Sequence, residues 1–287
     1  MLIGTVSLWA LNFTVSKYIL NHGFQPLAYS SVRYACAALI FAGLTLAWEG
    51  SLRVGRRELP LLVFAALVLF ANQLSFVYAL RFTTATTVAL LFGTLPIFTA
   101  LFARATGQEH LSRRFWAATV VSFLGVALVA AGSGGSLSAD IKGDTLAVLA
   151  AMTWAAYSVA IRPLMRRYSP FRLSAVFLLA VTVLLSIVGS GQLAKQDFHF
   201  GALVWIGFAF AVIGPLVVTN LLWFTAISRV GPSRASLFAN LQPFLAAVIA
   251  LVLLSEPITT TQVFGGLAIA GGIALAPRHP APEPPAE

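Results

Sequence analysis

The sequence predicts an all-α integral membrane protein with ten transmembrane helices, arranged as two inverted five-helix repeats. Of its 287 residues, 59% are hydrophobic and only 9% are charged, whereas soluble domains have about a quarter charged. Residues 235–254 contain no ionisable side chain, and about 20 helical residues are enough to cross a bilayer. The repeats are predicted because long segments recur at a constant spacing.

Ten apolar runs follow one another along the chain, separated by short connectors of the kind that join helix hairpins. They cover residues 2–20, 27–48, 60–80, 85–106, 114–131, 144–163, 171–190, 201–227, 233–254 and 261–277. The connector 132–143 is predicted to be a flexible linker, and the Pro-rich tail 278–287 is predicted to be disordered. No soluble domain fits between the runs.

The net charge of +9 is spread over the connectors, which argues against a nucleic-acid partner. One side of the predicted membrane holds thirteen arginines, and the other holds only Arg81, Lys142 and Lys195. The positive-inside rule therefore places the N- and C-termini in the cytoplasm. The single cysteine, Cys36, excludes a disulfide framework.

The repeat consists of residues 1–131 and 144–277. The pairs at an offset of 147 residues include Pro96 with Pro243, Glu109 with Glu256 and Gly125 with Gly272. At an offset of 145, Trp9 matches Trp154 and Lys17 matches Arg162. Because each half has an odd number of spans, the second half is inverted relative to the first. Such symmetry gives two nearly equivalent packings and suits alternating access.

A family resemblance is carried by the segments TVALLFGTLPIFTALFARATGQEHLS, ASLFANLQPFLAAVIALVLLSEPIT and GDTLAVLAAMTWAAYSVAIRPL. The chain resembles the EamA-type family of the drug/metabolite transporter superfamily, and within it bacterial exporters of aromatic and other neutral amino acids. This resemblance implies a multi-pass protein of the inner (plasma) membrane, with a central cavity lined mainly by the third, fourth, eighth and ninth spans. One departure is that the first half has FGTLP at the position where the second half has NLQP, so the two halves differ in polarity.

Prolines inside spans mark candidate hinges. A proline removes one helical hydrogen bond and frees the carbonyl four residues earlier, which for Pro96 and Pro243 belongs to Phe92 and Ala239. In lipid, such a carbonyl needs a partner or water. The dipeptide Gly214–Pro215 has no counterpart in the first half and indicates a local bend, or a hinge specific to the second half.

Amides that lie beside aromatic rings suit an amino-acid zwitterion with an apolar side chain. The candidate substrate-binding residues are Trp9, Asn12, Asn72, Gln73, Phe76, Tyr78, Trp154, Tyr157, Asn220, Trp223, Asn240 and Gln242. The alternative is that the amides bond to neighbouring helices and the rings belong to the core or the interfacial belt.

Charged residues within or beside the spans have several alternative roles. Lys17 and Arg162 could attract a carboxylate at opposite vestibules or reach the lipid head groups. Arg33 is expected to face protein or water rather than lipid. Glu109 and Glu256 are interpreted as structural, either capping the next helix or pairing with arginine.

The sequence shows no catalytic set, no metal cluster and no cofactor motif. All four histidines lie in connectors or the tail, and no acidic residue lies at mid-span. We therefore expect a facilitative transporter that exports neutral amino acids, with aromatic or large apolar ones favoured, or similar small metabolites. The alternatives are a membrane-embedded enzyme and a scaffold that does not transport. The expected partners are the small-molecule substrate and the lipid bilayer, and a monomer is the working expectation.

Overall fold

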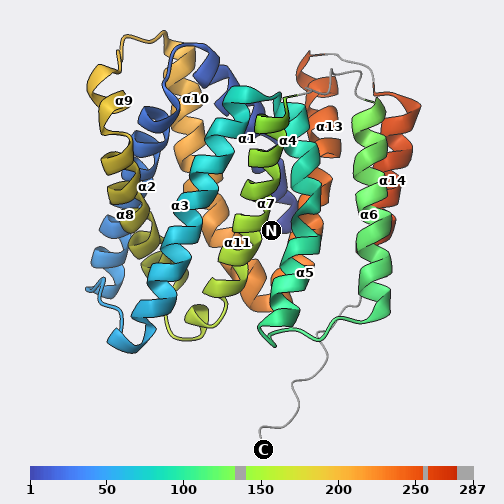
Figure 1. Cartoon of the computed structure of the whole chain (residues 1–287), viewed down its shortest axis with the longest axis horizontal. Helices are drawn as coiled ribbons and strands as arrows, with labels where there is room; N and C mark the ends of the chain where they lie inside the picture. The colour runs from blue at the N-terminus through green and yellow to red at the C-terminus, as the bar shows by residue number, and fades with distance from the viewer. Residues whose placement is uncertain (133–139, 255–257, 277–287) are drawn as a thin grey trace, which may run out of the picture.

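A computed structural model describes residues 1–132, 140–254 and 258–276, and all regular structure within these ranges is helical (Figure 1). The α-helices are α1 (Leu2–Asn21), α2 (Pro26–Glu49), α3 (Leu59–Phe82), α4 (Ala85–Leu91), α5 (Leu95–Ala105), α6 (Arg113–Gly132), α7 (Ile141–Ile161), α8 (Pro170–Val188), α9 (Ser190–Lys195), α10 (Ala202–Val212), α11 (Thr219–Val230), α12 (Pro232–Leu237), α13 (Gln242–Leu254) and α14 (Thr260–Leu275). Between them lie the 3-10 segments η1 (Arg56–Glu58), η2 (Phe92–Thr94), η3 (Leu164–Arg166) and η5 (Phe238–Leu241), and the π-helical segment η4 (Ile213–Val218).

Three sequence predictions fall wholly or partly on residues outside the described ranges. These are the tail 278–287, Glu256 and most of the linker 132–143. The last residues of that linker belong to a helix, because α7 begins at Ile141. The Asp140 side chain caps α7 by accepting a hydrogen bond of 2.9 Å from the backbone N–H of Lys142.

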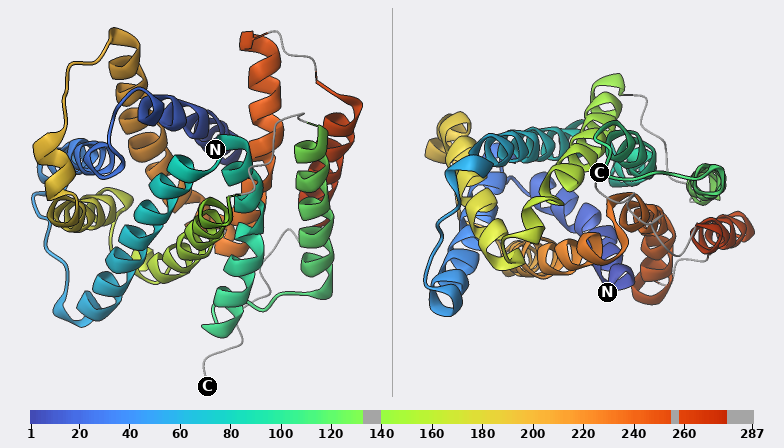
Figure 2. Two further views of the ribbon diagram at one scale, coloured as in Figure 1. Left: turned by 45° about the horizontal axis from the view of Figure 1, so that its top comes forward. Right: turned by 90° about the horizontal axis from the view of Figure 1, so that it is seen from below.

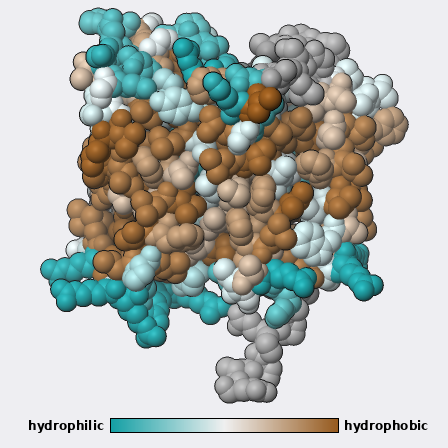
Figure 3. Space-filling model, viewed as in Figure 1, coloured by the Kyte–Doolittle hydropathy of each residue, from teal (hydrophilic) through white to brown (hydrophobic). Residues whose placement is uncertain are grey.

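The apolar surface forms a band between two polar ends, as a membrane protein requires (Figure 3). Seven described helical stretches are long and apolar enough to cross a membrane, and α14 is a shorter apolar helix. Large apolar side chains that are exposed include Leu39, Phe64, Leu124, Ile187, Ile206 and Phe264. The connectors after α2, α5 and α7, which carry most of the arginines, lie at the same end of the molecule (Figure 1).

The two repeat-related candidate hinge prolines, Pro96 and Pro243, each follow a break in their span. The segment η2 separates α4 from α5, and Pro96 lies in the first turn of α5. The segment η5 separates α12 from α13 in the same way, and Pro243 is the second residue of α13. A proline is tolerated in the first helical turn because its missing N–H would have no partner there. The repeat positions therefore share a local geometry as well as a sequence.

The dipeptide Gly214–Pro215 lies in η4, where the helix widens into a π turn between α10 and α11. Such turns bend a helix and are frequent at functional sites. The repeat-related helix α3 is continuous over its whole length. The bend is therefore present in only one of the two repeat-related helices.

Helices α6 and α14 stand side by side at one edge of the molecule (Figure 2). A Cβ atom added to Gly125 would lie 2.7 Å from the Gly265 carbonyl oxygen. A Cβ atom added to Gly272 would lie 2.7 Å from the Ala118 carbonyl oxygen. The two contacts are equivalent under the repeat, because the offset of 147 relates Gly125 to Gly272 and Ala118 to Gly265. The two backbones approach closely because the three glycines lack side chains.

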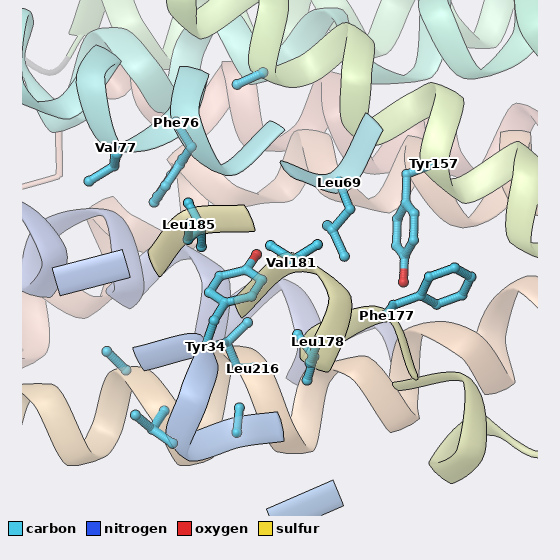
Figure 4. Close-up of a cluster of buried hydrophobic side chains, with 14 of the residues drawn as sticks. Tyr34, Leu69, Phe76, Val77, Tyr157, Phe177, Leu178, Val181, Leu185 and Leu216 are labelled. Atoms are coloured by element: carbon cyan, nitrogen blue, oxygen red, sulfur yellow. The ribbon is translucent and has the colours of Figure 1, made fainter. Parts of the chain in front are cut away.

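The main core lies among α2, α3, α7, α8 and α10–α11 (Figure 4). Tyr157 of α7 is buried here with its ring centroid 5.5 Å from that of Phe177 of α8. Tyr34 of α2 and Leu216 of η4 lie close together on another side of the same cluster (Figure 4). This core borders a central cavity, because Tyr34 and Leu216 also belong to the cavity wall.

Candidate functional site

A central cavity lies where both halves of the chain meet. Its lining residues are Trp9, Asn12, Phe13, Arg33, Tyr34, Asn72, Gln73, Phe76, Phe92, Leu95, Trp154, Pro215, Leu216 and Gln242. They come from α1, α2, α3, η2, α5, α7, η4 and α13. The cavity has a volume of about 70 Å³, below the roughly 300–1,000 Å³ of typical ligand pockets. A bound amino acid would therefore require the walls to separate.

Three indole rings pack together at one side of this cavity. The ring centroid of Trp9 lies 5.4 Å from that of Trp154 and 4.9 Å from that of Trp223. The Trp9 N–H donates to the Thr219 hydroxyl at 3.0 Å, and the Trp223 N–H donates to the Ser158 hydroxyl at 3.2 Å. The Trp154 N–H is buried without a hydrogen-bond partner among the described residues. One indole donor at the cavity wall is therefore free.

Several amides in the cavity wall differ in how firmly they are held. The Asn72 side chain donates to the Ala150 carbonyl at 2.8 Å, and that of Gln73 donates to the Ser30 hydroxyl at 3.0 Å. The Asn12 side-chain oxygen accepts from the Ser16 hydroxyl at 3.2 Å. Gln242 makes no hydrogen bond with its side chain among the described residues, although it is only 2% exposed. Gln242 is thus the amide most available to a ligand.

Arg33 is the one charged residue among the described residues that line the cavity. It is 3% exposed, and its Nε donates to the Ala211 carbonyl at 3.0 Å. Its guanidinium carbon lies 5.6 Å from the centroid of the Tyr29 ring, within the range of a cation–π contact. The side chain is therefore held by a helix backbone on one side and by an aromatic ring on the other.

A second cavity of about 250 Å³ adjoins the same region, and its walls come from α1, α4, α6, α13 and α14. Phe13 belongs to the lining of both cavities. Its ring centroid lies 5.7 Å from that of Phe76 and 5.5 Å from that of Phe92. The Phe13 ring thus forms part of the partition between the two spaces.

The structure brings together one group of the sequence-predicted site residues and separates another. The cavity lining includes the predicted Trp9, Asn12, Asn72, Gln73, Phe76, Trp154 and Gln242, and the candidate hinge residue Pro215. The lining does not include Tyr78, Tyr157, Asn220, Trp223 or Asn240.

Each residue outside the lining has a definite environment. Asn240 is fully buried and donates to the Ser122 hydroxyl of α6 at 3.0 Å. Tyr78 accepts from the Gln192 side chain at 3.2 Å. Trp223 lies behind the other two indoles and is fully buried. Tyr157 faces the core beside α8, and Asn220 of α11 is 7% exposed.

Six lining residues are absent from the sequence-based set of candidates. These are Phe13, Arg33, Tyr34, Phe92, Leu95 and Leu216. Phe13 could have been found from its spacing, since residues four apart on a helix share a face and Trp9 was already a candidate. Arg33 could have been found from its position within a span. The apolar residues carry no signal that separates a cavity wall from ordinary packing.

The repeat-related cations Lys17 and Arg162 bind backbone carbonyls at helix ends or connectors. The Lys17 ammonium donates to the carbonyls of Leu80 and Thr83 at 2.5 and 2.9 Å. The Arg162 guanidinium donates to the Gln108 carbonyl at 2.8 Å and lies 3.8 Å from a Glu109 carboxylate oxygen. Both cations therefore fasten a helix end to its neighbours.

Glu109 links the two halves of the chain. Its carboxylate accepts a hydrogen bond of 3.3 Å from the backbone N–H of Ser233 at the start of α12. Gly231, the residue before α12, has φ +80°, and a side chain there would collide with the Glu109 carboxylate. Burial raises the pKa of Glu109, while the Ser233 hydrogen bond and the Arg162 charge oppose the shift.

Known proteins resemble this chain over nearly its whole length. The model of the EamA-like transporter family matches residues 1–131 and 141–276. The chain is 25% identical to the transporter YyaM of Bacillus subtilis (strain 168), over 96% of this chain and 92% of that protein.

Two further relatives have names that mention amino acids. The "Probable terminal-alkyne amino-acid exporter" of Streptantibioticus cattleyicolor is 29% identical, over 94% of this chain and 90% of that protein. The "Probable amino-acid metabolite efflux pump" of Salmonella typhimurium is 24% identical, over 93% and 90% of the two chains. A solved crystal structure has the same fold, with a TM-score of 0.78 at 20% identity and coverage of 96% of this chain and 94% of the other.

Proposed function

The chain belongs to the EamA-like transporter family, and on that premise we propose that it exports neutral amino acids, or similar small metabolites, from a bacterial cytoplasm. Amino acids with aromatic or large apolar side chains are favoured. Two relatives whose names mention amino acids support this substrate class. The family and the names of its members indicate a transporter rather than an enzyme.

The observation that carries the proposal is the composition of the central cavity wall. Aromatic rings supply much of the surface, with Trp9, Phe76 and Trp154 among them. Neutral amides and one guanidinium supply the polar groups. An apolar side chain would bury its surface against the rings, while the polar groups would orient the two charged ends of the zwitterion.

Alternating access is supported by the matching breaks at η2 and η5. Each break lies beside the central cavity, since Phe92 and Gln242 contribute to its wall. Inverted repeats give a protein two nearly equivalent packings around one midplane site. Under this proposal the narrow cavity widens toward one membrane face at a time, with Pro96, Pro243 and the Gly214–Pro215 bend taking up the motion.

Transport is proposed to be facilitative, in the inner membrane, with both termini in the cytoplasm. A proton-coupled carrier needs a group at the site that titrates as the carrier alternates. No aspartate, glutamate or histidine lines the cavity among the described residues. The cytoplasmic placement is supported by the arginine-bearing connectors that share one end of the molecule.

The test is counterflow in liposomes that contain the purified full chain. Labelled phenylalanine or leucine outside should enter liposomes loaded with the unlabelled amino acid, without an imposed pH gradient. Uptake no greater than in protein-free liposomes across a panel of neutral amino acids would refute the proposed substrate class. Uptake that appears only with a pH gradient would refute the facilitative mechanism but leave the substrate class intact.

A further inference from the structure

A buried cation in the cavity wall lacks a partner of opposite charge. Arg33 lies seven residues after Pro26, so it is about 10 Å along α2 from the start of that helix. No aspartate or glutamate of the described residues lies within 4.0 Å of its guanidinium. An ionised group inside a membrane protein is costly unless it is paired or faces a polar space. Such a site is therefore suited to a ligand that brings a negative charge.

The Arg33 side chain is positioned by the bend in the opposite wall. Pro215 has no backbone N–H, so the carbonyl of Ala211, four residues earlier, lacks its usual helical donor. Arg33 Nε donates to this carbonyl at 3.0 Å. The contact satisfies a polar group that the proline has freed, and it fixes the orientation of the guanidinium. Pro215 itself lies in the cavity wall beside this contact.

The two terminal nitrogens of Arg33 remain available. They make no hydrogen bond with the described residues, and the residue lines the cavity. A guanidinium held through Nε presents its two terminal nitrogens as a planar fork, which matches the two oxygens of a carboxylate. Snorkelling to head groups does not explain this placement, because the side chain is 3% exposed and bonded to Ala211.

We propose that Arg33 binds the carboxylate of the transported molecule and so makes a carboxylate a requirement for recognition. This inference rests on the proposed function and narrows it to substrates that carry a carboxylate. The free amide oxygen of Gln242 and the ring faces of Trp9 and Trp154 lie in the same wall and can meet the ammonium group. An amine that lacks the carboxylate would place a second positive charge beside Arg33.

The experiment compares phenylalanine, its carboxamide and phenethylamine, which share one side chain and differ only at the carboxylate. Each is used to compete with labelled phenylalanine for counterflow in liposomes that contain the full chain. The parent protein should prefer phenylalanine by about ten- to a hundredfold, the loss expected for a hydrogen bond to a charged group. This comparison requires no mutation and so does not depend on a variant folding.

Two variants and a control locate the effect. Arg33→Gln should lose the preference for phenylalanine over its carboxamide, and Arg33→Lys should retain part of it because the charge remains while the fork is lost. Arg57→Gln should behave like the parent, because Arg57 is exposed in the connector between α2 and α3.

Two results separate a failure of this inference from a failure of the proposed function. If the parent exchanges phenylalanine but carries all three compounds equally, or if Arg33→Gln keeps the preference, only the Arg33 inference falls. If uptake of every amino acid by the parent is no greater than in protein-free liposomes, the proposed function is refuted, and the Arg33 inference is refuted with it.

Discussion

The two halves of the chain contribute unequally to the central cavity. The first half supplies ten of the fourteen described lining residues and the second half supplies four. Aligning the prolines that begin α2 and α8, Pro26 and Pro170, pairs Arg33 with Phe177. In the first half Arg33 lies in the cavity wall, whereas in the second half Phe177 is packed in the core. The two halves therefore share a helical arrangement but carry different side chains at aligned positions.

The repeat at the offset of 145 shows the same divergence on the neighbouring helices. Asn12 of α1 lines the cavity, and its counterpart Tyr157 of α7 packs on Phe177. The second half has an aromatic pair where the first half has an amide and a guanidinium. Under the proposed function, the helices that move would be related by symmetry, whereas the groups that recognise the substrate would not.

The two departures from symmetry also contact each other. Pro215, whose repeat-related position in α3 is Val68, frees the Ala211 carbonyl. Arg33, whose aligned position in α8 is Phe177, donates to that carbonyl. A cation in α2 and a proline in η4 are each costly alone. Together they satisfy one buried acceptor and orient one donor, which is a physical reason for them to occur together.

The largest effect in the comparison of the two halves is expected at the α6–α14 contact, where both halves contribute equivalent glycines. Gly125→Leu and Gly272→Leu should each abolish or greatly reduce folded protein, because the new side chain meets backbone atoms at 2.7 Å. Overpacking a tight contact typically costs about 1–3 kcal/mol and occasionally more. The measurement is the yield of monodisperse protein in detergent. Gly271→Leu is the control, since no atom lies within 4 Å of a Cβ there. Equal yields for all three variants would contradict the close approach.

A smaller but more selective effect is expected at two amides that lie close together in the second half. Gln242→Ala should raise the KM for phenylalanine by about tenfold, since one hydrogen bond to a charged group is lost. Asn240→Ala should instead lower the melting temperature and leave the KM unchanged, because Asn240 bonds to Ser122 outside the cavity. Counterflow kinetics and thermal unfolding in detergent distinguish the two results. A raised KM in Asn240→Ala, with an unchanged KM in Gln242→Ala, would show that Asn240 and not Gln242 contacts the substrate.

The repeat-related indoles of Trp9 and Trp154 should show the same contrast between stability and substrate affinity as Asn240 and Gln242, but with smaller effects. Both variants lose similar ring packing, but Trp9→Phe should destabilise the protein by about 1 kcal/mol more, because its hydrogen bond to Thr219 is also lost. The Trp154 indole N–H has no such partner in the described part of the chain. The effect of Trp154→Phe should be on substrate affinity. Equal losses of stability in both variants would contradict the prediction that only the Trp9 indole N–H contributes a stabilising hydrogen bond.

The smallest expected effect concerns pH and the Glu109 link between the halves. Burial raises the pKa of Glu109 above its ordinary value of 4.5. As pH rises above about 4.5, the unfolded chain loses this proton before the folded protein does, so the contribution of Glu109 to stability decreases. Glu109→Gln should flatten this decline when melting temperature is followed upward from pH 4.5. An unchanged slope would show that other groups dominate the pH dependence.

Much of the fold could be predicted because it depends on composition, periodicity and proline. The breaks beside Pro96 and Pro243 follow from the chemistry of the proline ring, which is local. The pairing of Trp9 with Trp154 follows from the repeat. The number of ten membrane spans stays a prediction beside the seven stretches identified by length and hydropathy.

The orientation of individual side chains could not be read with the same accuracy. Asn240 and Gln242 are two residues apart, so a helical path places them on different faces, and only Gln242 reaches the cavity. Tyr157 is one turn from Trp154, yet it points toward α8. Which face of a helix meets the cavity depends on how neighbouring helices pack, and the spacing of residues along one helix does not specify that packing.

The Arg33 charge also has a consequence for the electrical behaviour of the membrane. A fixed positive charge inside a narrow path repels protons and sodium ions, as arginine does in other selective pores. A neutral zwitterion bound to it would leave the net charge of the site the same when loaded and when empty. The outward and return steps of the cycle would then move equal charge across the field. Membrane voltage would neither drive nor oppose net export, and the carrier would conduct no cation current while it works.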